Sequence, residues 1–340
     1  MAEDNPIPAF DIAFPYAFGS PDTSADFRCL PEDFVVDEQL GFTPDGEGEH
    51  LMLQIRKRGE NTAWVAEQLA NFFGIKTMDV GFCGLKDRHA QTSQWFSLYL
   101  PKSDPEEDAA RLAAFFAGTE AQVELLTSGR HTKKLRRGQH EANFFQITLR
   151  HVASFAGLDL RLNRILEQGV PNYFGEQRFG RNQSNLHSAS RWFDRGEVIR
   201  NRNKKVMAKS AARSYLFNRV LAGRVANGSW DQIVDKDPDS TSGPLWGRGR
   251  SQVSDALAQV EMQALEGKAA WLRGLEHVGL QQERRALVLK PVGFSWEQKG
   301  GGLNLAFGLP PGAFATSVLR EIAFLSNKST GPEVSDTPSG

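Results

Sequence analysis

Residues 81–100 read G-F-C-G-L-K-D-R-H-A-Q-T-S-Q-W-F-S-L-Y-L, and the interpretation of the whole chain begins from this stretch. The largely apolar run over residues 78–85 predicts a buried strand, and a second strand is predicted over residues 95–100. Gly84 permits a tight exit from the first strand. The turn between the two strands carries Lys86, Asp87 and Arg88, which place one carboxylate between two cations. Two strands joined by a sharp turn would hold that carboxylate rigidly.

Asp87 has two interpretations. Nearby positive charge favours the ionised form of a carboxyl group, and an ionised carboxylate on a fixed turn can act as a nucleophile or a general base. A Lys-Asp-Arg triplet is nevertheless most often a solvated turn with a weak ion pair. The remaining segments of the chain must decide between these two interpretations.

The composition is that of a globular protein with room for two domains. The chain has 340 residues, 40% of them hydrophobic and 24% charged, and its formal net charge is −1. Its two cysteines, Cys29 and Cys83, exclude a disulfide framework and lack the spacing of a metal site. The N-terminal residues M-A-E-D-N-P do not form a secretory signal, and no apolar run reaches 18 residues. We therefore expect a cytoplasmic protein with no membrane segment and no metal.

Hydrophobic periodicity predicts an α+β fold with a mixed β-sheet. Pro31 interrupts the first strand-like run and argues for an edge position or a strand entry. Asn61 is a suitable cap for the helix that Gly74 ends. Strands are predicted at 27–36, 50–58, 123–126, 145–149, 284–294 and 303–307. Helices are predicted at 104–117, 157–168, 183–194, 206–226 and 254–267. A last helix is predicted after the two prolines at 310 and 311, with Val318, Ile322 and Leu325 on one face.

The order of these elements predicts how the domains are arranged. Strands lie towards both ends of the chain, whereas the middle is rich in helices. We expect residues 25–155 and 283–325 to form one domain around the sheet, with residues 156–282 inserted as a second domain. Residues 1–24 would be an irregular arm, and the polar residues 326–340 a disordered tail.

Two basic clusters are concealed by the near-zero net charge. The first lies at residues 130–137, without an acid among its members, and the second at residues 195–209, with the single acid Glu197. Such runs are usually solvated surface, but they can also contact the phosphates of a nucleic acid. The first cluster leads into Asn143 and Phe145, and Phe145 could belong to the core or stack on an unstacked base.

Four motifs of the chain, taken together and in this order, resemble those of the tRNA pseudouridine synthase D family. They span almost the whole chain: P-E-D-F-V-V (31–36), G-L-K-D-R-H-A-Q-T-S-Q (84–94), G-V-P-N-Y-F-G-E-Q-R-F-G (169–180) and F-A-T-S-V-L-R-E (314–321). The resemblance implies isomerisation of uridine to pseudouridine at position thirteen of tRNA, in the D-arm region. It also implies a pseudouridine synthase-like catalytic domain with a mixed sheet and an inserted family-specific domain.

The resemblance also implies roles for particular residues. The family's catalytic aspartate falls on Asp87, and the aromatic residue of its N-x-F motif falls on Phe145. Its substrate-contacting residues fall on Phe34, Asn143 and Phe314. Arg28 corresponds in kind to a basic residue that precedes P-E-D-F in the family. Lys86 or Arg88 would keep Asp87 charged or hold a phosphate.

The implied reaction breaks the glycosidic C–N bond, rotates the uracil and rejoins it through carbon five. It needs no redox step, so no cofactor is expected, and the base must first be flipped out of the folded tRNA. Asp87 could form a covalent adduct with the sugar, or remove the C2′ proton to give a glycal. The sequence leaves both routes open.

Three other interpretations compete with this one. An RNA-binding protein without catalysis would keep the basic clusters but would not need Asp87. A carboxylate hydrolase would need a paired acid, for which Glu32, Asp33 and Glu176 are available. An α+β protein with incidental charge clusters is the third. The expected partner is one tRNA or a few tRNA species; a monomer is favoured, although the sequence does not give the oligomeric state.

Overall fold

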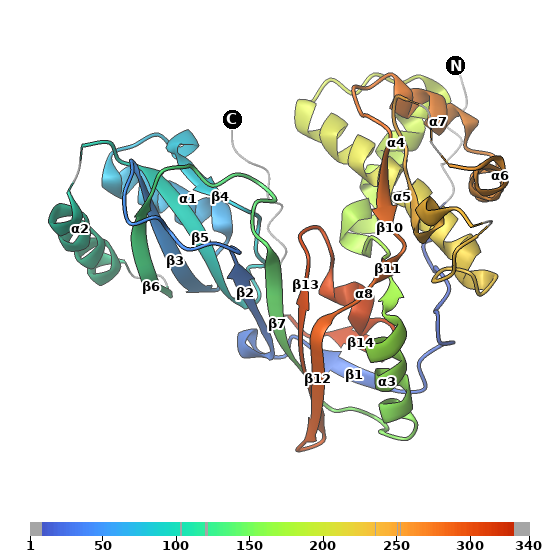
Figure 1. The fold of residues 1–340 in the computed structure, drawn as a ribbon, viewed down its shortest axis with the longest axis horizontal. Coiled ribbons are helices and arrows are strands. Elements are labelled where there is room, and N and C mark those ends of the chain that lie inside the picture. Colours follow the sequence, from blue (N-terminus) through green and yellow to red (C-terminus); the bar gives the residue numbers. More distant parts are fainter. Residues whose placement is uncertain are drawn as a thin grey trace. The chain divides into compact units, whose positions relative to one another are not determined.

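The computed structural model describes residues 9–329, apart from residues 103, 120, 121, 235, 250 and 252. Within that range the chain forms two compact units (Figure 1). Unit 1 consists of residues up to 22 together with 156–290 and 313–322; unit 2 consists of 23–155, 291–312 and the residues from 323 onward. Residues 283–290 and 313–322 thus pack within unit 1, although the predicted catalytic domain includes them. Part of the predicted arm, residues 1–8, and most of the predicted tail, residues 330–340, lie outside the described residues.

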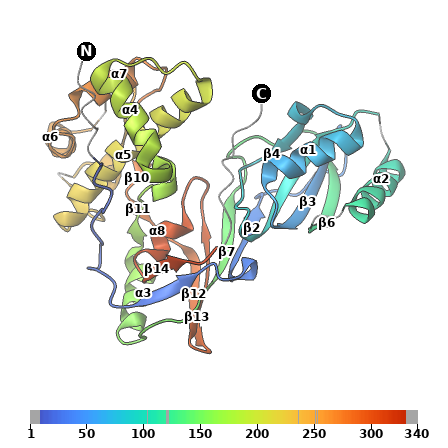
Figure 2. The ribbon, with the colours of Figure 1, turned by 180° about the vertical axis from the view of Figure 1, so that it is seen from behind.

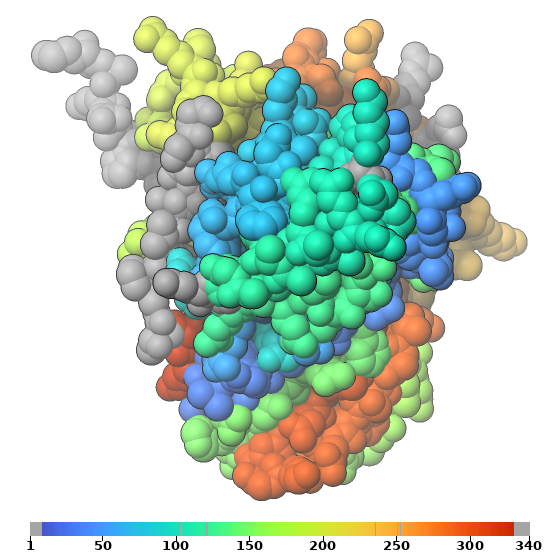
Figure 3. Space-filling view, turned by 90° about the vertical axis from the view of Figure 1, so that its left-hand side faces the viewer, coloured from blue at the N-terminus to red at the C-terminus, as the bar shows by residue number. Residues whose placement is uncertain are grey.

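Unit 2 is built on one mixed sheet of eight strands. Its strands are β2 (Phe34–Gln39), β3 (His50–Arg58), β4 (Val80–Phe82), β5 (Gln91–Tyr99), β6 (Val123–His131), β7 (Ala142–Leu149), β12 (Val292–Lys299) and β13 (Gly302–Leu309). The strand order is β12-β13-β7-β2-β5-β3-β6, with β4 added beside β5. Only the pairing of β2 with β5 is parallel. Figure 3 shows the orange hairpin β12–β13 against the green part of the chain, so segments far apart in sequence share this surface.

Helix α1 (Thr62–Phe73) covers one face of this sheet, as Figure 2 shows, with α1 in front of β3. Its start follows from Asn61, whose side chain accepts a hydrogen bond from the main-chain N–H of Trp64, and its end from Gly74 in the left-handed conformation at φ 69°. Leu69 of α1 packs with Leu53 and Phe96 of the sheet in one core cluster. The predicted cap and stop are therefore confirmed. Helix α2 (Pro105–Gly118) adds Leu112 and Phe115 to the same cluster.

A second, two-stranded sheet in unit 2 joins distant parts of the chain. Strand β1 (Ser24–Phe27) pairs in parallel with β14 (Phe324–Asn327). After β1, a 3₁₀ turn η1 (Pro31–Asp33) separates it from β2, because Pro31 has no main-chain N–H to donate to a sheet. The single predicted strand over 27–36 is therefore two strands. β14 also includes Ser326 and Asn327, which the sequence placed in the disordered tail.

Unit 1 is mostly helical. Its helices are α3 (Leu158–Gln168), α4 (Ser184–Arg195), α5 (Arg202–Ala226), α6 (Asp255–Ala264), α7 (Ala269–Glu276) and α8 (Ala315–Leu319). The strands are β8 (Val170–Pro171), β9 (Ser242–Leu245), β10 (Glu283–Ala286) and β11 (Val288–Leu289), and short 3₁₀ turns are η3 (Glu176–Phe179), η4 (Arg181–Gln183) and η5 (Pro238–Thr241). The long helix α5 runs through the centre, where Ala212 and Leu216 pack with Trp271 of α7.

Two other wrong predictions concern the limits of apolar runs. The apolar run over 78–85 is a 3₁₀ turn η2 (Thr77–Asp79) followed by the three residues of β4, and both Met78 and Leu85 are exposed. The last helix ends at Leu319, so Leu325 lies in β14 and not on the helix. In both places apolar residues lie outside the helix or strand that the pattern predicts. Periodicity reports which residues are apolar, and it does not by itself mark where an element ends.

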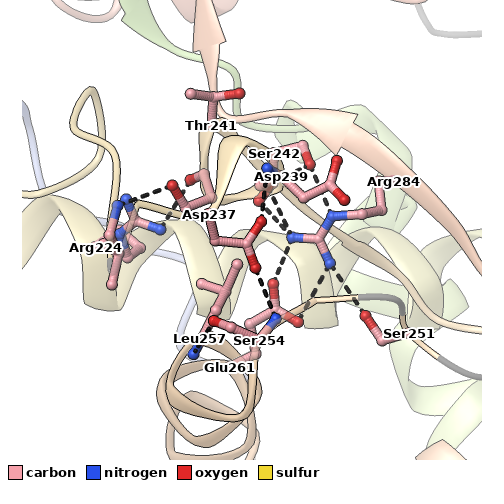
Figure 4. Close-up of polar contacts among 12 residues, drawn as sticks. Arg224, Asp237, Asp239, Thr241, Ser242, Ser251, Ser254, Leu257, Glu261 and Arg284 are labelled. Atoms are coloured by element: carbon pink, nitrogen blue, oxygen red, sulfur yellow. Dashed lines mark hydrogen bonds and ion pairs between the residues drawn. The ribbon is translucent and has the colours of Figure 1, made fainter.

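A buried ion pair fastens η5 and β10 to α6 in unit 1. Figure 4 shows Arg284 among the main-chain and side-chain oxygens of η5, β9 and α6. Its Nη2 lies 2.6 Å from Oε1 of Glu261, and its Nε donates to Oγ of Ser242 at 2.7 Å. Glu261 is almost fully buried, so its charge depends on this arginine for a partner.

We predict that Glu261→Ala lowers the free energy of unfolding by about 3 kcal/mol, because it leaves a largely buried guanidinium without its carboxylate. Urea denaturation would measure the change. Glu124→Ala is the matched control, since Glu124 pairs with Arg56 at the exposed surface, where loss of a pair costs less than about 1 kcal/mol. Equal effects of the two substitutions would contradict the role of the buried pair.

Candidate active site

The turn that carries Asp87 lies between β4 and β5 and is fixed by buried polar side chains. Oγ1 of Thr62, at the start of α1, accepts a hydrogen bond from the main-chain N–H of Lys86 at 2.9 Å and donates to Oε1 of Gln94 at 2.7 Å. The amide of Gln94 in turn donates to the carbonyl of Gly84 at 3.2 Å. Thr62 and Gln94 are both fully buried. The turn is thereby tied to a helix and to a strand before any substrate arrives.

Lys57 supports the main chain of Asp87 itself. Alternation along β3 places Lys57 on the same face as Leu53 and Ile55, so its side chain enters the core beside α1. Its Nζ donates to the carbonyl of Glu60 at 2.5 Å and to the carbonyl of Asp87 at 3.2 Å. Burial lowers the pKa of Lys57 to about 8, and the charge of Asp87 offsets part of that effect. Lys57 therefore fixes the main chain of the turn from the core side of the sheet.

The carboxylate of Asp87 is held on both oxygens. Oδ2 lies 2.6 Å from Nη2 of Arg28, and Oδ1 accepts a hydrogen bond from the main-chain N–H of His89 at 2.9 Å. The side chain is 26% exposed, so it is anchored and still accessible. Each carboxylate oxygen keeps a second lone-pair direction for another partner.

Arg28 is as firmly placed as its partner. Its guanidinium lies over the rings of Phe27 and Phe34, 4.7 Å and 4.6 Å from their centroids, and the residue is 9% exposed. Its main chain has φ 59°, a left-handed conformation that disfavours a residue with a Cβ. Strain of this kind persists where the surrounding contacts enforce it. Two aromatic rings and one carboxylate supply those contacts here.

The cations next to Asp87 in sequence, Lys86 and Arg88, contact other groups, and among the described residues neither forms an ion pair with Asp87. Nζ of Lys86 forms a buried ion pair with Glu38 of β2, and Glu38 also accepts from the main-chain N–H of Trp95 at 3.0 Å. Nε of Arg88 donates to the carbonyl of Gly59 at 2.7 Å. Successive side chains of a tight turn point in different directions. The ion-pair partner of Asp87 is therefore a residue distant in sequence, Arg28, which follows β1.

Asn143, Phe34 and Phe145 lie in unit 2 with Asp87. Nδ2 of Asn143 lies 3.0 Å from Nε2 of His140, while its buried Oδ1 has no hydrogen-bond partner among the described residues. Burial lowers the pKa of His140, so the neutral ring is favoured. Phe145 is buried; it stacks on Phe307 at 5.5 Å and meets the edge of Phe34 at 5.9 Å. Phe145 and Phe307 thus pack against Phe34, and the ring of Phe34 in turn packs against the guanidinium of Arg28.

Residues 132–134, 136 and 137 of the first basic cluster line an open hollow of about 720 Å³ in unit 2, together with residues 50, 138 and 139. Arg130, at the start of the cluster, is instead buried in an ion pair with Asp108. The loop is anchored by Leu135, which is buried and whose main-chain N–H donates to Oγ of Ser97 at 3.0 Å. The N–H of Gly138 donates to the carbonyl of Cys83 at 2.8 Å. Burial raises the pKa of the Cys83 thiol to about 12. The cations are thus presented by a fixed loop.

Phe314 belongs to unit 1, at the start of α8. Its ring lies 6.2 Å from that of Phe174 and 5.6 Å from the guanidinium carbon of Arg178. It is half-buried, so part of the ring remains open to a ligand. Across the described ranges, no group of three His, Cys, Asp or Glu side chains is placed to hold a metal ion. In that same part of the chain, every helix is too short or too polar to cross a bilayer.

Comparison with known proteins now identifies the family. The family model of tRNA pseudouridine synthase D matches residues 13–201. A tRNA pseudouridine synthase D from Cellvibrio japonicus is 49% identical over 96% of this chain and 98% of its own length. The chain belongs to the tRNA pseudouridine synthase D family. Another tRNA pseudouridine synthase D, from Vibrio parahaemolyticus, is 40% identical over 90% of this chain and 94% of its own length.

The fold agrees with this assignment. A crystal structure from Methanosarcina mazei, of a protein provisionally assigned as tRNA pseudouridine synthase D, superposes with a TM-score of 0.64. It covers 90% of this chain and 95% of the other, at 20% sequence identity. The predicted family resemblance and the α+β fold class are both confirmed. Sequence reasoning missed Lys57 and His140, although the alternation that placed Leu53 and Ile55 inside the fold also placed Lys57 there.

We predict that Lys57 makes stability rise between pH 8 and pH 10.5. Its pKa is about 8 in the folded chain and about 10.5 when unfolded, so within this window the unfolded state binds a proton that the folded state lacks. The free energy of unfolding should therefore increase with pH by at most about 1.4 kcal/mol per unit relative to Lys57→Met.

Urea denaturation of both proteins at pH 7.5, 9 and 10 measures this difference, and groups common to both proteins cancel. Lys299→Met removes an exposed lysine at the end of β12 and serves as the control. Parallel pH dependence of wild type and Lys57→Met would show that the lysine titrates in the same way in both states.

Proposed function

We propose that this chain isomerises uridine to pseudouridine in tRNA, at position thirteen in the D-arm region, with Asp87 as the catalytic carboxylate. One observation carries the proposal: in a chain of this family, Asp87 is ion-paired with Arg28 on a turn that Thr62 and Lys57 fix at the main chain. A carboxylate so placed needs little reorganisation when it reacts.

The reaction is an exchange of bonds within one nucleotide. The bond between C1′ and N1 breaks, the uracil turns, and a bond between C1′ and C5 forms while the hydrogen of C5 is lost and N1 gains a proton. Asp87 either attacks C1′ and later leaves it, or takes the C2′ proton and returns it. The chemistry is complete without a redox partner, and both routes use the carboxylate that Arg28 holds in an ion pair.

The other residues that match the family motifs would bind and shape the nucleotide. Phe34 and Phe145 support Arg28 and form an apolar wall, while the unpartnered Oδ1 of Asn143 is suited to accept a hydrogen bond from the base. We propose that the half-open ring of Phe314 contacts the flipped base. Arg88 is exposed and would bind a phosphate of the tRNA. Lys86 is paired with Glu38, so it would act on the substrate only indirectly, by holding the turn of Asp87.

The tRNA partner also needs contacts with its backbone. We propose that the fixed basic loop at 132–139 and the basic segment at 195–209 contact tRNA phosphates, so that affinity falls as salt rises. Residues 25–155 and 283–325 would be the catalytic domain and residues 156–282 the family-specific domain. Action as a monomer, on a few tRNA species in the cytoplasm, completes the proposal.

We predict that Asp87→Asn lowers conversion of unmodified tRNA by a factor of about 1,000 or more at unchanged tRNA affinity, because the amide keeps the shape and loses the charge. Single-turnover conversion with chemical labelling of pseudouridine measures the rate. Asp255→Asn, at an exposed position on α6, is the control and should convert normally.

Three outcomes would overturn this assignment. Full activity of Asp87→Asn would make Asp87 structural. Binding without conversion by the wild type, on every tRNA offered, would favour an RNA-binding relative, and an abasic site detected by mass would favour a hydrolase.

We also predict that Arg28→Met lowers the conversion rate about 10- to 100-fold with little change in tRNA affinity, because Asp87 loses the cation that orients it. Methionine keeps the packing between Phe27 and Phe34. Arg28→Lys, which retains the charge, should recover part of the rate. A methionine variant as fast as the wild type would remove Arg28 from the site.

A further inference from the structure

Arg178 of unit 1 has a positive charge without a negative partner. It lies in η3, within the motif at 169–180, and is half-buried. Its Nη1 donates to the neutral hydroxyl of Ser210 at 3.1 Å. None of the ion pairs formed by the described residues includes Arg178. A guanidinium offers five N–H donors, so most of its donors are left for another acceptor.

This arrangement is unfavourable for folding alone. Burial lowers the pKa of Arg178, and no neighbouring carboxylate offsets that effect. Buried arginines are normally paired, because removing a charge from water costs free energy that a partner must return. The rings of Phe174 and Phe314, 5.4 Å and 5.6 Å from the guanidinium carbon, give only a cation–π attraction. The chain therefore retains a cation that its own stability does not require.

A second arginine increases the positive potential at the same place. Arg285 of β10 also lies over the ring of Phe174, at 4.2 Å from its centroid. Its guanidinium donates to Oδ1 of Asn172 at 2.6 Å. Burial lowers the pKa of Arg285 to about 10, and the charge of Arg178 adds to this effect. Two arginines that repel each other are thus brought together beside one ring.

The frame that holds this pair is rigid. Asn218, fully buried on α5, accepts from the main-chain N–H of Phe174 at 2.8 Å and donates to its carbonyl at 2.9 Å. The hydroxyl of Ser317 on α8 donates to the carbonyl of Tyr173 at 2.7 Å. The aromatic rings and the cation are therefore placed in advance, as a site for a phosphate beside a stacked base requires.

We propose that Arg178, with Arg285 beside it, binds a phosphodiester of the RNA strand, while Phe314, packed on the buried Phe174, provides the apolar surface next to it. The inference rests on the proposed function, because it assumes that the strand is that of a tRNA substrate. It assigns to unit 1 a phosphate contact separate from the two basic clusters. This contact is made by a partly buried guanidinium, which discriminates more strongly for a phosphate oxygen than a surface lysine does.

The test compares Arg178→Met and Arg178→Lys with Arg273→Met, which removes an exposed arginine from α7 of the same unit. In sodium chloride, the melting temperature of Arg178→Met should equal or exceed that of the wild type. At matched ionic strength, sodium phosphate should raise the melting temperature of the wild type and of Arg273→Met more than that of Arg178→Met. Arg178→Lys should retain part of the response.

Titration with unmodified tRNA completes the test. Arg178→Met should bind about tenfold more weakly than the wild type, and the slope of log affinity against log salt should be shallower by about one. A phosphate response and salt slope that survive in Arg178→Met would overturn the proposal. A large loss of stability in chloride would also overturn it, because the arginine would then be a structural strut. Since these readouts measure binding, they stand even if the wild type converts no uridine.

Discussion

Strand β5 is hydrogen-bonded along both edges, and the position of Asp87 depends on that constraint. On one edge β3 pairs with all of β5; on the other, β2 pairs with Gln91–Ser93 and β4 with Phe96–Leu98. A one-residue slip would turn every buried side chain of β5 to the wrong face, so its register is strongly specified. Because the turn of Asp87 ends where β5 begins, that register also fixes the carboxylate. The polar ties to Thr62 and Gln94 then fix its orientation.

Local signals were sufficient for much of the fold. The alternation over 50–58 gave strand β3 with its observed limits, and Asn61 and Gly74 set the ends of α1, because caps and left-handed glycines act within a few residues. The failures have one cause. Met78 and Leu85 are apolar and exposed, and Leu325 is apolar in a strand that follows the last helix. Whether an apolar side chain finds a partner is decided by distant parts of the chain, which periodicity does not report.

The candidate site shows the same division. Asp87 could be selected from sequence because its turn lies among family motifs, and Arg28 because it precedes P-E-D-F. Their pairing could not be derived, since Lys86 and Arg88 are nearer in sequence and are directed to Glu38 and to the carbonyl of Gly59. Lys57 was accessible to reasoning, as a lysine on the inward face of a strand. Arg178 was not accessible in this way, because what distinguishes it is that no carboxylate pairs with it among the described residues, and a sequence does not show this.

The pairing of β1 with β14 constrains how this protein can be made. Ser24 of β1 lies opposite Phe324 of β14. β1 is therefore synthesised about 300 residues before the strand that pairs with it. Strand β7 likewise needs β13, and unit 1 needs residues 313–322. At about 5–20 residues per second, the ribosome exposes unpaired edges of β1 and β7 for roughly 10 seconds or more before their partners emerge. During that interval the nascent chain has open strand edges, which are templates for pairing with other chains until β14 and β13 cover them.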